Sequence, residues 1–369
     1  MEKKRTTFFD KLVVLLAIVA AICLVGSILA SSSDPREHIV LAFLGLAYPF
    51  ILFSNLIILT YWLVRRKWVF SLLTLAIICW GWHTLIATIG FFGNAGKNEK
   101  AEDELVRVMT YNVHNFKPYG DEITEQVKDE MLNVVRDQNP DVVCFQEFFT
   151  KPNGPFDTVD SLKKLLNTKY YYFVPTMQST SEAIGLAIFS KYPIKDKGKI
   201  VFEEAGGNES IYVDLAVNKH ALRIYNVHLQ SISFEIEDYS YLEKVKSDMN
   251  VEKGSSKRIL RMLRSAFKKR STQVDIMKAH MKTCTTPFVI AGDFNDTPAS
   301  YAVTKMTDSL NNAFIKKGQG LGRTYNGKFP NFQIDYIATT IDIEVTNYHI
   351  VEAKLSDHFP VRSDLRLKQ

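Results

Sequence analysis

The stretch "AGDFNDTP", residues 291–298, is the segment from which the fold of this chain is best inferred. An apolar run typical of a buried strand, residues 287–291, leads into it and stops abruptly. Because successive strand residues point to opposite faces, we expect Asp293 and Asn295 to emerge on one face and Phe294 on the other. Glycine, aspartate, asparagine and proline are also ordinary turn residues, so the stretch by itself is typical of a turn.

Five further apolar or alternating stretches carry acids, amides or histidines in the same way. They are 106–116 with Asn112, 141–149 with Glu147, 222–231 with Asn226 and His228, 332–340 with Asp335, and 355–361 with Asp357 and His358. Helical patterns lie between them, such as residues 122–138, and this alternation predicts an α/β sandwich. Catalytic groups collect on strand-end loops, so the repeated pattern predicts one shared site.

The predicted site is rich in hard oxygen ligands. Carboxylates and amides suit Mg²⁺ or Mn²⁺, which keep several waters and take only one or two carboxylates from the protein. Two histidines, without a serine or cysteine nucleophile motif, fit water activation and leaving-group stabilisation. The pattern therefore indicates metal-assisted hydrolysis of a phosphate ester.

The order of these motifs resembles that of the endonuclease/exonuclease/phosphatase superfamily. The motifs are TYNVHNF (110–116), DVVCFQE (141–147), NVHLQS (226–231), GDFND (292–296), IDYI (334–337) and SDHFPV (356–361). The superfamily includes pancreatic deoxyribonuclease, abasic-site endonucleases, neutral sphingomyelinases and inositol polyphosphate 5-phosphatases. The resemblance covers residues 105–367 and implies a four-layer α/β sandwich of two packed sheets flanked by helices, in a catalytic domain over 105–369.

The resemblance also implies roles for individual residues. Glu147 corresponds to the principal metal ligand, with Asn112 and Asp357 near the ion. Asp293 is similar to the residue that orients or deprotonates the attacking water. Asn295 resembles the amide that holds the phosphate.

Two histidines complete the implied site. His358 resembles the histidine that faces the scissile phosphate, with Asp335 as the carboxylate that fixes its tautomer. His228 resembles a second phosphate-facing histidine and is a candidate general acid. Together with Asn295, His228 and Asn226 are the expected substrate-binding residues.

The sequence departs from the family pattern at three positions. Glu182 is near the expected place of an acid that supports His228, but it is not cleanly in register. Gln333 stands where the family often has arginine before the aspartate of "IDY". Alternation puts His114 on the same side as Asn112, although a solvated loop position is commoner for such a histidine.

The first part of the chain contains three apolar stretches without charge, residues 12–30, 39–64 and 68–92. Each is long enough to cross a hydrocarbon core of about 30 Å as a helix, which predicts three membrane spans. Buried core helices are the weaker alternative because soluble helices need a polar face. Residues 93–104 form a polar linker to the second domain.

Basic residues predict the orientation of these spans. Lys3, Lys4, Arg5 and Lys11 precede the first span, and Arg65, Arg66 and Lys67 separate the second from the third. Basic loops stay in the cytoplasm, so we expect a cytoplasmic N-terminus and an extracytoplasmic catalytic domain. If the first span were a cleaved signal peptide, the final topology would be the same.

Charge bears on the substrate. Residues 97–369 contain 37 Lys and Arg against 36 Asp and Glu, which is unlike the basic footprint of a tight duplex binder. Residues 244–270, however, contain ten Lys and Arg against two acids, and 256–281 has a helical pattern. This segment is either a solvated face or a surface that holds a polyanion or an anionic bilayer.

Three functions remain open. The first is a membrane-anchored, Mg²⁺-dependent phosphodiesterase or nuclease that acts outside the cytoplasm. The second is a lipid or polyol phosphoesterase of the same fold. The third is a non-catalytic membrane interaction module. The expected partners are accordingly a phosphate-ester substrate, either nucleic acid or phospholipid, and the membrane.

Overall fold

The computed structural model describes residues 8–91, 93, 96, 99–117, 124–202, 208–232, 241, 253–327 and 330–368. The chain divides into two compact units. The smaller contains Met1–Thr88 and Asp296–Lys305, and the larger contains Ile89–Asn295 and Met306–Gln369. The larger unit therefore begins before the polar linker predicted at 93–104.

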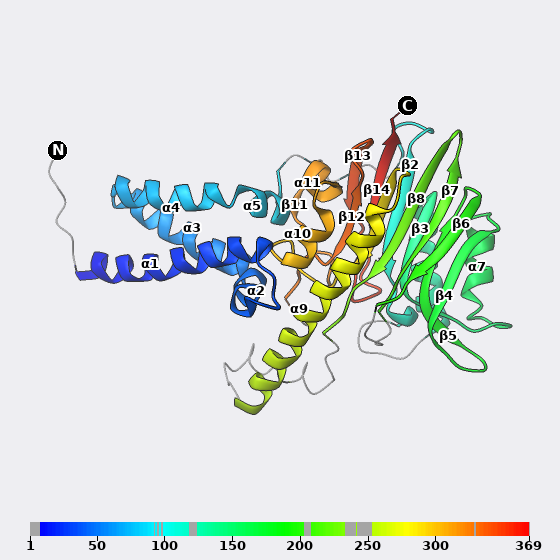
Figure 1. The fold of residues 1–369 in the computed structure, drawn as a ribbon, viewed down its shortest axis with the longest axis horizontal. Helices are drawn as coiled ribbons and strands as arrows, with labels where there is room; N and C mark the ends of the chain where they lie inside the picture. Colours follow the sequence, from blue (N-terminus) through cyan, green and yellow to red (C-terminus); the bar gives the residue numbers. More distant parts are fainter. Residues whose placement is uncertain are drawn as a thin grey trace. The chain divides into compact units, whose positions relative to one another are not determined.

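Two six-stranded mixed sheets form the larger unit (Figure 1). The first has the order β13 (Ile343–Ile350), β14 (Val361–Leu367), β2 (Val106–Asn112), β3 (Val142–Thr150), β5 (Ala183–Ser190) and β4 (Tyr170–Gln178). The second has the order β10 (Asn311–Asn312), β12 (Asp335–Thr339), β9 (Phe288–Asp293), β8 (His220–His228), β7 (Ser210–Val217) and β6 (Ile194–Ile200). Among the described strand pairs, only β2–β3 and β8–β9 are parallel.

Each parallel pair is joined through a helix, as parallel neighbours require. Helix α6 (Glu125–Gln138) lies between β2 and β3 in the chain, and α9 (Lys253–Lys282) lies between β8 and β9. The α6 helix begins where the Thr124 hydroxyl accepts a hydrogen bond from the Val127 amide at 3.2 Å. It ends at Asn139, which adopts the left-handed conformation common at helix ends.

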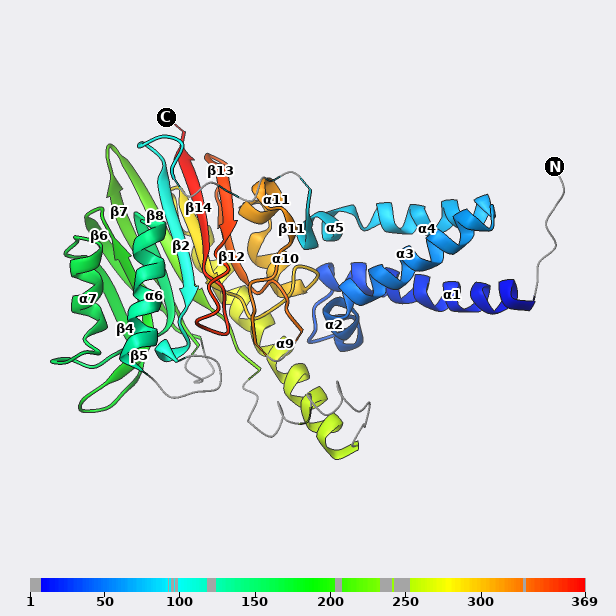
Figure 2. The ribbon, with the colours of Figure 1, turned by 180° about the vertical axis from the view of Figure 1, so that it is seen from behind.

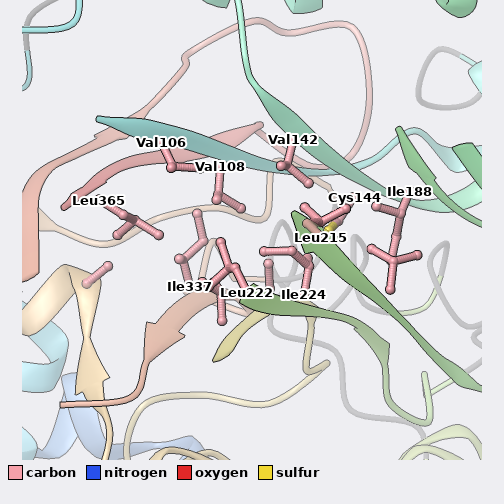
Figure 3. Packing of buried hydrophobic residues seen from close by; sticks show 14 of the residues in the cluster. Val106, Val108, Val142, Cys144, Ile188, Leu215, Leu222, Ile224, Ile337 and Leu365 are labelled. Carbon is pink, nitrogen blue, oxygen red and sulfur yellow. The ribbon is translucent and has the colours of Figure 1, made fainter. Parts of the chain in front are cut away.

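Alternating apolar residues of the two sheets form the central core (Figure 3). Val108 and Val142 of the first sheet face Leu222 and Ile224 of the second, and all four are fully buried. This arrangement confirms the predicted α/β sandwich of two packed sheets. It follows from the period-2 apolar pattern, because one face of each strand must be removed from water.

Helices cover the outer faces of both sheets. A second core packs β2, β3 and β5 against α6 and α7 (Thr158–Leu165), including Met131 and Leu162. On the other sheet, His280 of α9 packs edge-on against Tyr225 at 5.6 Å between ring centroids. Figure 1 shows α9 in front of the sheets, and Figure 2, from behind, shows α6 in front of the sheets beside β2.

Short elements complete this unit: β1 (Ile89–Gly90), the 3₁₀ turn η2 (His114–Phe116), α11 (Ala313–Lys317) and β11 (Gly320–Leu321), together with the end of α10 (Tyr301–Thr307). Strand β1 pairs with β11, and the Gly93 amide donates to the Gly318 carbonyl at 3.0 Å. The third apolar stretch, predicted to extend to residue 92, thus leaves the helical conformation at Thr88.

Several predicted boundaries are wrong. The predicted strand 355–361 is a loop, and β14 begins only at Val361. The predicted strand 106–116 stops at Asn112, and 332–340 becomes regular only at Asp335. Asp357 and His358 lie in the loop before β14, whereas Asn112 is the last residue of β2 and Asp335 the first residue of β12.

The smaller unit contains α1 (Phe8–Leu29), η1 (Ala30–Ser32), α2 (Ile39–Leu46), α3 (Tyr48–Val64), α4 (Trp68–Trp80) and α5 (Trp82–Thr88). Among the described residues, one continuous helix, Phe8–Ser32, is long and apolar enough to cross a membrane. The other two predicted spans are helix pairs bent by 67° and 69°. Pro49 and Gly81 lie at these breaks, where a missing amide and a missing Cβ disfavour a continuous helix.

Polar contacts tie α1 to α3. Arg65 donates to the buried Asp10 carboxylate at 2.9 Å, and the Tyr61 hydroxyl donates to the same carboxylate at 2.7 Å. Farther along, the Asn55 side-chain amide donates to the Ala20 carbonyl at 3.1 Å. The start of α1 and the end of α3 therefore lie at the same end of this helical unit.

Candidate active site

Sheet topology brings the six predicted motifs to one end of the sandwich. The parallel strands β2, β3, β8 and β9 all finish there. Strands β12 and β14 begin there because they are antiparallel to their neighbours: Asp335 pairs with Asp293, and Val361 pairs with Thr110. Acids, amides and histidines more than 200 residues apart in the chain therefore become neighbours.

Glu147 enters this cluster from a β-bulge. The pairing of β3 with β5 shifts register between Phe145 and Phe148. Within this bulge Glu147 has φ 51°, a conformation that is rare for a side chain other than glycine, asparagine or aspartate. Such strain persists only where the surrounding structure holds it, and functional sites are where it concentrates.

Asn112 links two carboxylates. Its side-chain amide donates to Glu147 Oε1 at 3.2 Å and to Asp293 Oδ2 at 3.1 Å. Asn112 itself is buried at the last position of β2. A single amide thus sets the spacing between the acid predicted to bind metal and the acid predicted to activate water.

Asp293 is held by the turn that follows β9. The Asn295 backbone amide donates to Asp293 Oδ1 at 2.8 Å, and its side-chain amide donates to Oδ2 at 3.1 Å. Burial raises the pKa of Asp293 to about 7, against the opposing effect of His358. Gly292 is required beside it, because a Cβ there would overlap the Val227 carbonyl of the parallel neighbour.

Asp293 and Asn295 do point into the same cluster, as predicted, but strand alternation is not the reason. Phe294 is indeed buried away from the cluster, but β9 ends at Asp293 and Asn295 adopts φ 53°. The turn, not strand alternation, directs its side chain. Asn295 Nδ2 also donates to the Leu229 carbonyl at 3.0 Å, so both of its amide protons are engaged.

His358 forms a buried pair with Asp335. His358 Nδ1 lies 2.9 Å from Asp335 Oδ2, and its Nε2 lies 3.7 Å from Asp293 Oδ2. Burial alone lowers the pKa of His358, but the carboxylates of Asp335, Asp293 and Asp357 outweigh it and raise the pKa well above the ordinary histidine value. The imidazole is accordingly held in its charged form.

His228 approaches the same carboxylates from β8. Its Nε2 is 3.8 Å from both Glu147 Oε1 and Asp293 Oδ2, and it is buried with no hydrogen-bond partner among the described residues. Burial lowers the pKa of His228, while the charge of Glu147 opposes this. A buried polar atom without a partner costs stability, so its retention indicates a role in binding.

Asp357 contacts His114, for which a solvated loop position was the commoner expectation. Its Oδ1 lies 3.0 Å from His114 Nδ1, and His114 has φ 44° in the turn after β2. Burial by itself raises the pKa of Asp357. The charges of His358 and His114 have the larger, opposite effect, so the pKa lies below its ordinary value. The Ser356 hydroxyl donates to the Asn112 carbonyl at 3.0 Å and was also missed; its place directly before the "DH" pair was the available signal.

Two residues expected in the site have their contacts elsewhere among the described residues. Asn226 is fully buried between the sheets, where its amide donates to the carbonyls of Phe145 and Ala187 and its oxygen accepts from Gln146. Its donors are therefore engaged away from any substrate. Glu182 is exposed in the turn before β5, whereas His228 is buried, so Glu182 does not support that ring.

The donor atoms fit a divalent cation. The carboxylates of Glu147 and Asp357 retain partial exposure, at 32% and 14% of their side chains, and hard cations prefer such oxygens. Asn112 donates to Glu147 at 3.2 Å and accepts from the His114 backbone amide at 3.1 Å, and His114 Nδ1 lies 3.0 Å from Asp357 Oδ1. This set takes two carboxylates from the protein and leaves exposed oxygens for waters or phosphate.

A second group of ligand atoms lies within 4.8 Å of one another, formed by Asp293, Asp335 and His358. In this group the Nδ1 atom of His358 is already bonded to Asp335. That geometry suits a charged histidine–carboxylate pair better than a metal ligand set, since a cation would compete with the imidazolium. The Glu147 side of the cluster therefore fits a cation better than this second group does.

Comparison with protein families matches residues 109–248 and 278–358 to the Endonuclease/Exonuclease/phosphatase family. The two ranges cover more than half of the chain. The chain belongs to this family. As members of this family are metal-dependent hydrolases that act on phosphate esters, so is this protein. Residues 10–88 match a domain of unknown function (DUF8431), and no curated protein matches the chain.

Solved structures of family proteins share the fold. An endonuclease/exonuclease/phosphatase family protein from Bacteroides thetaiotaomicron is 16% identical, covering 71% of this chain and 97% of its own, with a TM-score of 0.51. The human Nocturnin catalytic domain with bound sulfate is 16% identical, with coverages of 72% and 95% and a TM-score of 0.50. A humanized D. rerio TDP2 is 14% identical, with coverages of 72% and 100% and a TM-score of 0.50.

Proposed function

We propose that this family member is a membrane-anchored, Mg²⁺- or Mn²⁺-dependent phosphodiesterase that acts outside the cytoplasm. The observation that carries the chemistry is the convergence of two histidines on one carboxylate. His228 Nε2 and His358 Nε2 lie 3.8 and 3.7 Å from Asp293 Oδ2. At this spacing neither Nε2 is hydrogen-bonded to the acid, so both remain able to contact a phosphate oxygen or a water that lies beside the three groups.

In the proposed reaction Asp293 accepts a proton from the attacking water. The water oxygen forms the new bond to phosphorus as the bond to the leaving oxygen breaks. A carboxylate with a pKa of about 7 is a suitable base near neutral pH. Asn112 and Asn295 keep it oriented through hydrogen bonds of 3.1 Å, so Asn295 is proposed as a positioning residue rather than a phosphate ligand.

His358 is the proposed proton donor to the leaving oxygen. Its Nδ1 is held at 2.9 Å by Asp335, whereas the nearest carboxylates to His228 are 3.8 Å away. Neutral His228 would instead donate a hydrogen bond from Nε2 to a phosphoryl oxygen. This exchanges the roles of the two histidines that the family resemblance implied.

Glu147, Asn112 and Asp357 are proposed to hold the metal ion. A bound divalent cation would neutralise charge that develops on the phosphoryl oxygens and orient the ester. The protein residues contribute the fixed spacing, because Asn112 connects Glu147 to Asp293. Removing the ion should therefore abolish turnover while the fold remains.

A nuclease-like substrate is favoured by the basic face of α9. Arg270 of this helix donates to the Gln230 carbonyl at 2.9 Å, just past the site end of β8. The helix begins at Lys253, 17 residues before Arg270 (Figure 1). At a rise of 1.5 Å per residue, its N-terminal part extends about 25 Å beyond Arg270. Lys257, Arg261 and Arg264 are exposed there with the spacing of a single helix face.

A lipid or polyol phosphoesterase is the second candidate. The observation in its favour is the apolar helix Phe8–Ser32, which would keep the catalytic domain at a bilayer surface. A non-catalytic module is not supported, because each of the expected acids and histidines is retained in the cluster.

The membrane topology is also a proposal. Residues 8–88 would form three spans, two of them bent, with Arg65, Arg66 and Lys67 in the cytoplasm. The contact between Asp10 and Arg65 agrees, because it requires the start of α1 and the end of α3 to lie on one side. The catalytic domain would then follow an odd number of spans and lie outside.

A substrate panel tests the catalytic proposal. The full chain in a non-ionic detergent is assayed with duplex and single-stranded nucleic acid, sphingomyelin, phosphoinositide and a chromogenic diester. We expect turnover to vanish in chelator and to return with Mg²⁺ or Mn²⁺. Asp293→Asn and His358→Ala should each reduce turnover at least about a hundredfold, the usual scale for a lost acid–base group. Full activity in excess chelator contradicts the proposal.

Reporter fusions test the topology. Alkaline phosphatase fused after residue 95 should be active and a cytoplasmic fluorescent reporter dark, while fusions after Arg66 should give the opposite pair of results. The reverse pattern would put the active site in the cytoplasm.

A further inference from the structure

A cavity of about 640 Å³ lies behind the catalytic histidine loop. Its walls come from the end of β13 and the segment after it, from residues 319–326 and from Asn331. Arg323 and Lys354 both line it, and neither forms an ion pair with any residue that the structure describes. Glu352 is the acid in the same wall, so the lining carries a net positive charge.

Backbone pairing separates this cavity from the catalytic cluster. Tyr325 and His358 form an antiparallel bridge, flanked by hydrogen bonds of 2.7 Å from Asn326 N to Asp357 O and from Phe359 N to Thr324 O. Paired residues point to one face of such a ribbon and their neighbours to the other. The rings of Tyr325 and His358 accordingly lie 5.6 Å apart, while Asn326 and Phe359 line the cavity.

The cavity combines charge with apolar surface. Leu321, Ile350 and Phe359 contribute to the lining beside the two cations, and Leu321 is 56% exposed. A free phosphate ester would use only the cations. An amphiphile with an anionic head would use both kinds of surface, because burial of its apolar part adds free energy in proportion to area.

One wall of this cavity is paired with the residues that directly follow the apolar region in the chain. Leu321 is paired with Ile89, and Gly320 with Gly90. Paired strands lie about 5 Å apart, and Ile89 directly follows the last helical residue, Thr88. If residues 68–88 end at the bilayer surface, the cavity opens within a few residues of that surface.

We infer that this cavity binds the phosphate headgroup of an anionic phospholipid, with Arg323 and Lys354 contacting the phosphate. Leu321 and Phe359 would contact the glycerol and the first acyl carbons. The bound lipid would lie on the reverse side of the ribbon that carries His358, and so outside the catalytic cluster. The inference rests on the proposed membrane insertion of residues 8–88, but not on the proposed chemistry.

The test measures binding without turnover. Full-length Asp293→Asn protein in non-ionic detergent and excess chelator is titrated with dihexanoyl phosphatidylglycerol below its micelle concentration, and the midpoint of thermal unfolding is followed. We expect a saturable rise in the midpoint. Dihexanoyl phosphatidylcholine and inorganic phosphate should require at least tenfold higher concentrations.

Variants assign the response to the cavity. Arg323→Gln with Lys354→Gln should raise the half-saturating concentration at least tenfold, while Lys195→Gln on the exposed edge strand β6 should leave it unchanged. Equal binding of inorganic phosphate would overturn the lipid assignment in favour of a free phosphate ester. No saturable shift, or a shift unaffected by the double variant, would overturn the site itself. Because catalysis is blocked throughout, a failure here is distinct from a failure of the proposed reaction.

Discussion

His358 Nδ1 lies 2.9 Å from Asp335 Oδ2, and both side chains are buried where β12 begins and the loop before β14 ends. The acid keeps the ring charged despite burial and directs its other nitrogen toward Asp293. A buried charge that keeps its partner is tolerated, whereas the same charge alone is strongly destabilising. The catalytic role proposed for His358 is therefore expected to depend on Asp335.

Replacing Asp335 should show whether it acts by orienting the His358 ring or by stabilising the charge on that ring. Asp335→Asn can still contact Nδ1 but cannot stabilise an imidazolium, so we expect turnover of a chromogenic diester to fall about a hundredfold or more. Circular dichroism should show an unchanged fold. Asp342→Asn, which alters an exposed acid after the same strand, is the matched control. Turnover within threefold of wild type would exclude the pair from catalysis.

The metal assignment predicts a different kinetic change. Glu147→Gln removes a ligand charge, so the half-saturating Mg²⁺ concentration should rise at least about tenfold, the scale seen when a metal site is weakened. Titration of activity with Mg²⁺ measures this directly. Glu182→Gln removes an exposed acid outside the cluster and should leave the titration unchanged. Identical titrations for the two variants would place the ion elsewhere.

Asn226 is expected to affect stability rather than substrate binding. Asn226→Ala removes the side-chain donor to two carbonyls and the acceptor of one Gln146 amide proton between the sheets, at a cost of about 3 kcal/mol. The midpoint of thermal unfolding should fall by roughly 6–12 °C. KM of the residual folded enzyme should not change. Gln126→Ala on the exposed face of α6 is the control, and a raised KM with normal stability would restore a substrate-binding role.

The basic face of α9 should matter only for large substrates. Glutamine at Lys257, Arg261 and Arg264 should raise KM for a nucleic acid and flatten its salt dependence, because fewer counterions are released on binding. Turnover of a small chromogenic ester should stay the same. Glutamine at Lys195, Lys197 and Lys199 of β6 makes the same charge change elsewhere. Parallel changes for polymer and small ester would identify α9 as a solvated face, and a response limited to lipid vesicles would favour the lipid phosphoesterase.

The nine residues that precede α9 in the predicted basic segment, 244–252, lie outside the described residues.

Local sequence determined much of this protein. The period-2 apolar pattern fixed which strands form the core, since each must bury one face, and the order of the motifs was enough to indicate the family. The chemistry of the cluster also followed from residue types, because acids, amides and histidines at the ends of buried strands need polar partners, and a shared site supplies them. The apolar composition of residues 12–30 likewise predicted the one continuous helix, among the described residues, that could cross a membrane.

Tertiary structure decided how individual side chains point. Glu147 turns into the site through a bulge that leaves no local signal, and Asn295 through a left-handed turn that the residue types alone did not distinguish from a strand end. Asn226 lies on β8 only two positions from His228, yet its side-chain amide is hydrogen-bonded to the first sheet. The pairing of His114 with Asp357 joins residues far apart in the chain. A pattern of residue types specifies the period of the secondary structure and the chemical character of the site. Bulges, turns and contacts between sheets depend on residues that meet only when the two sheets pack.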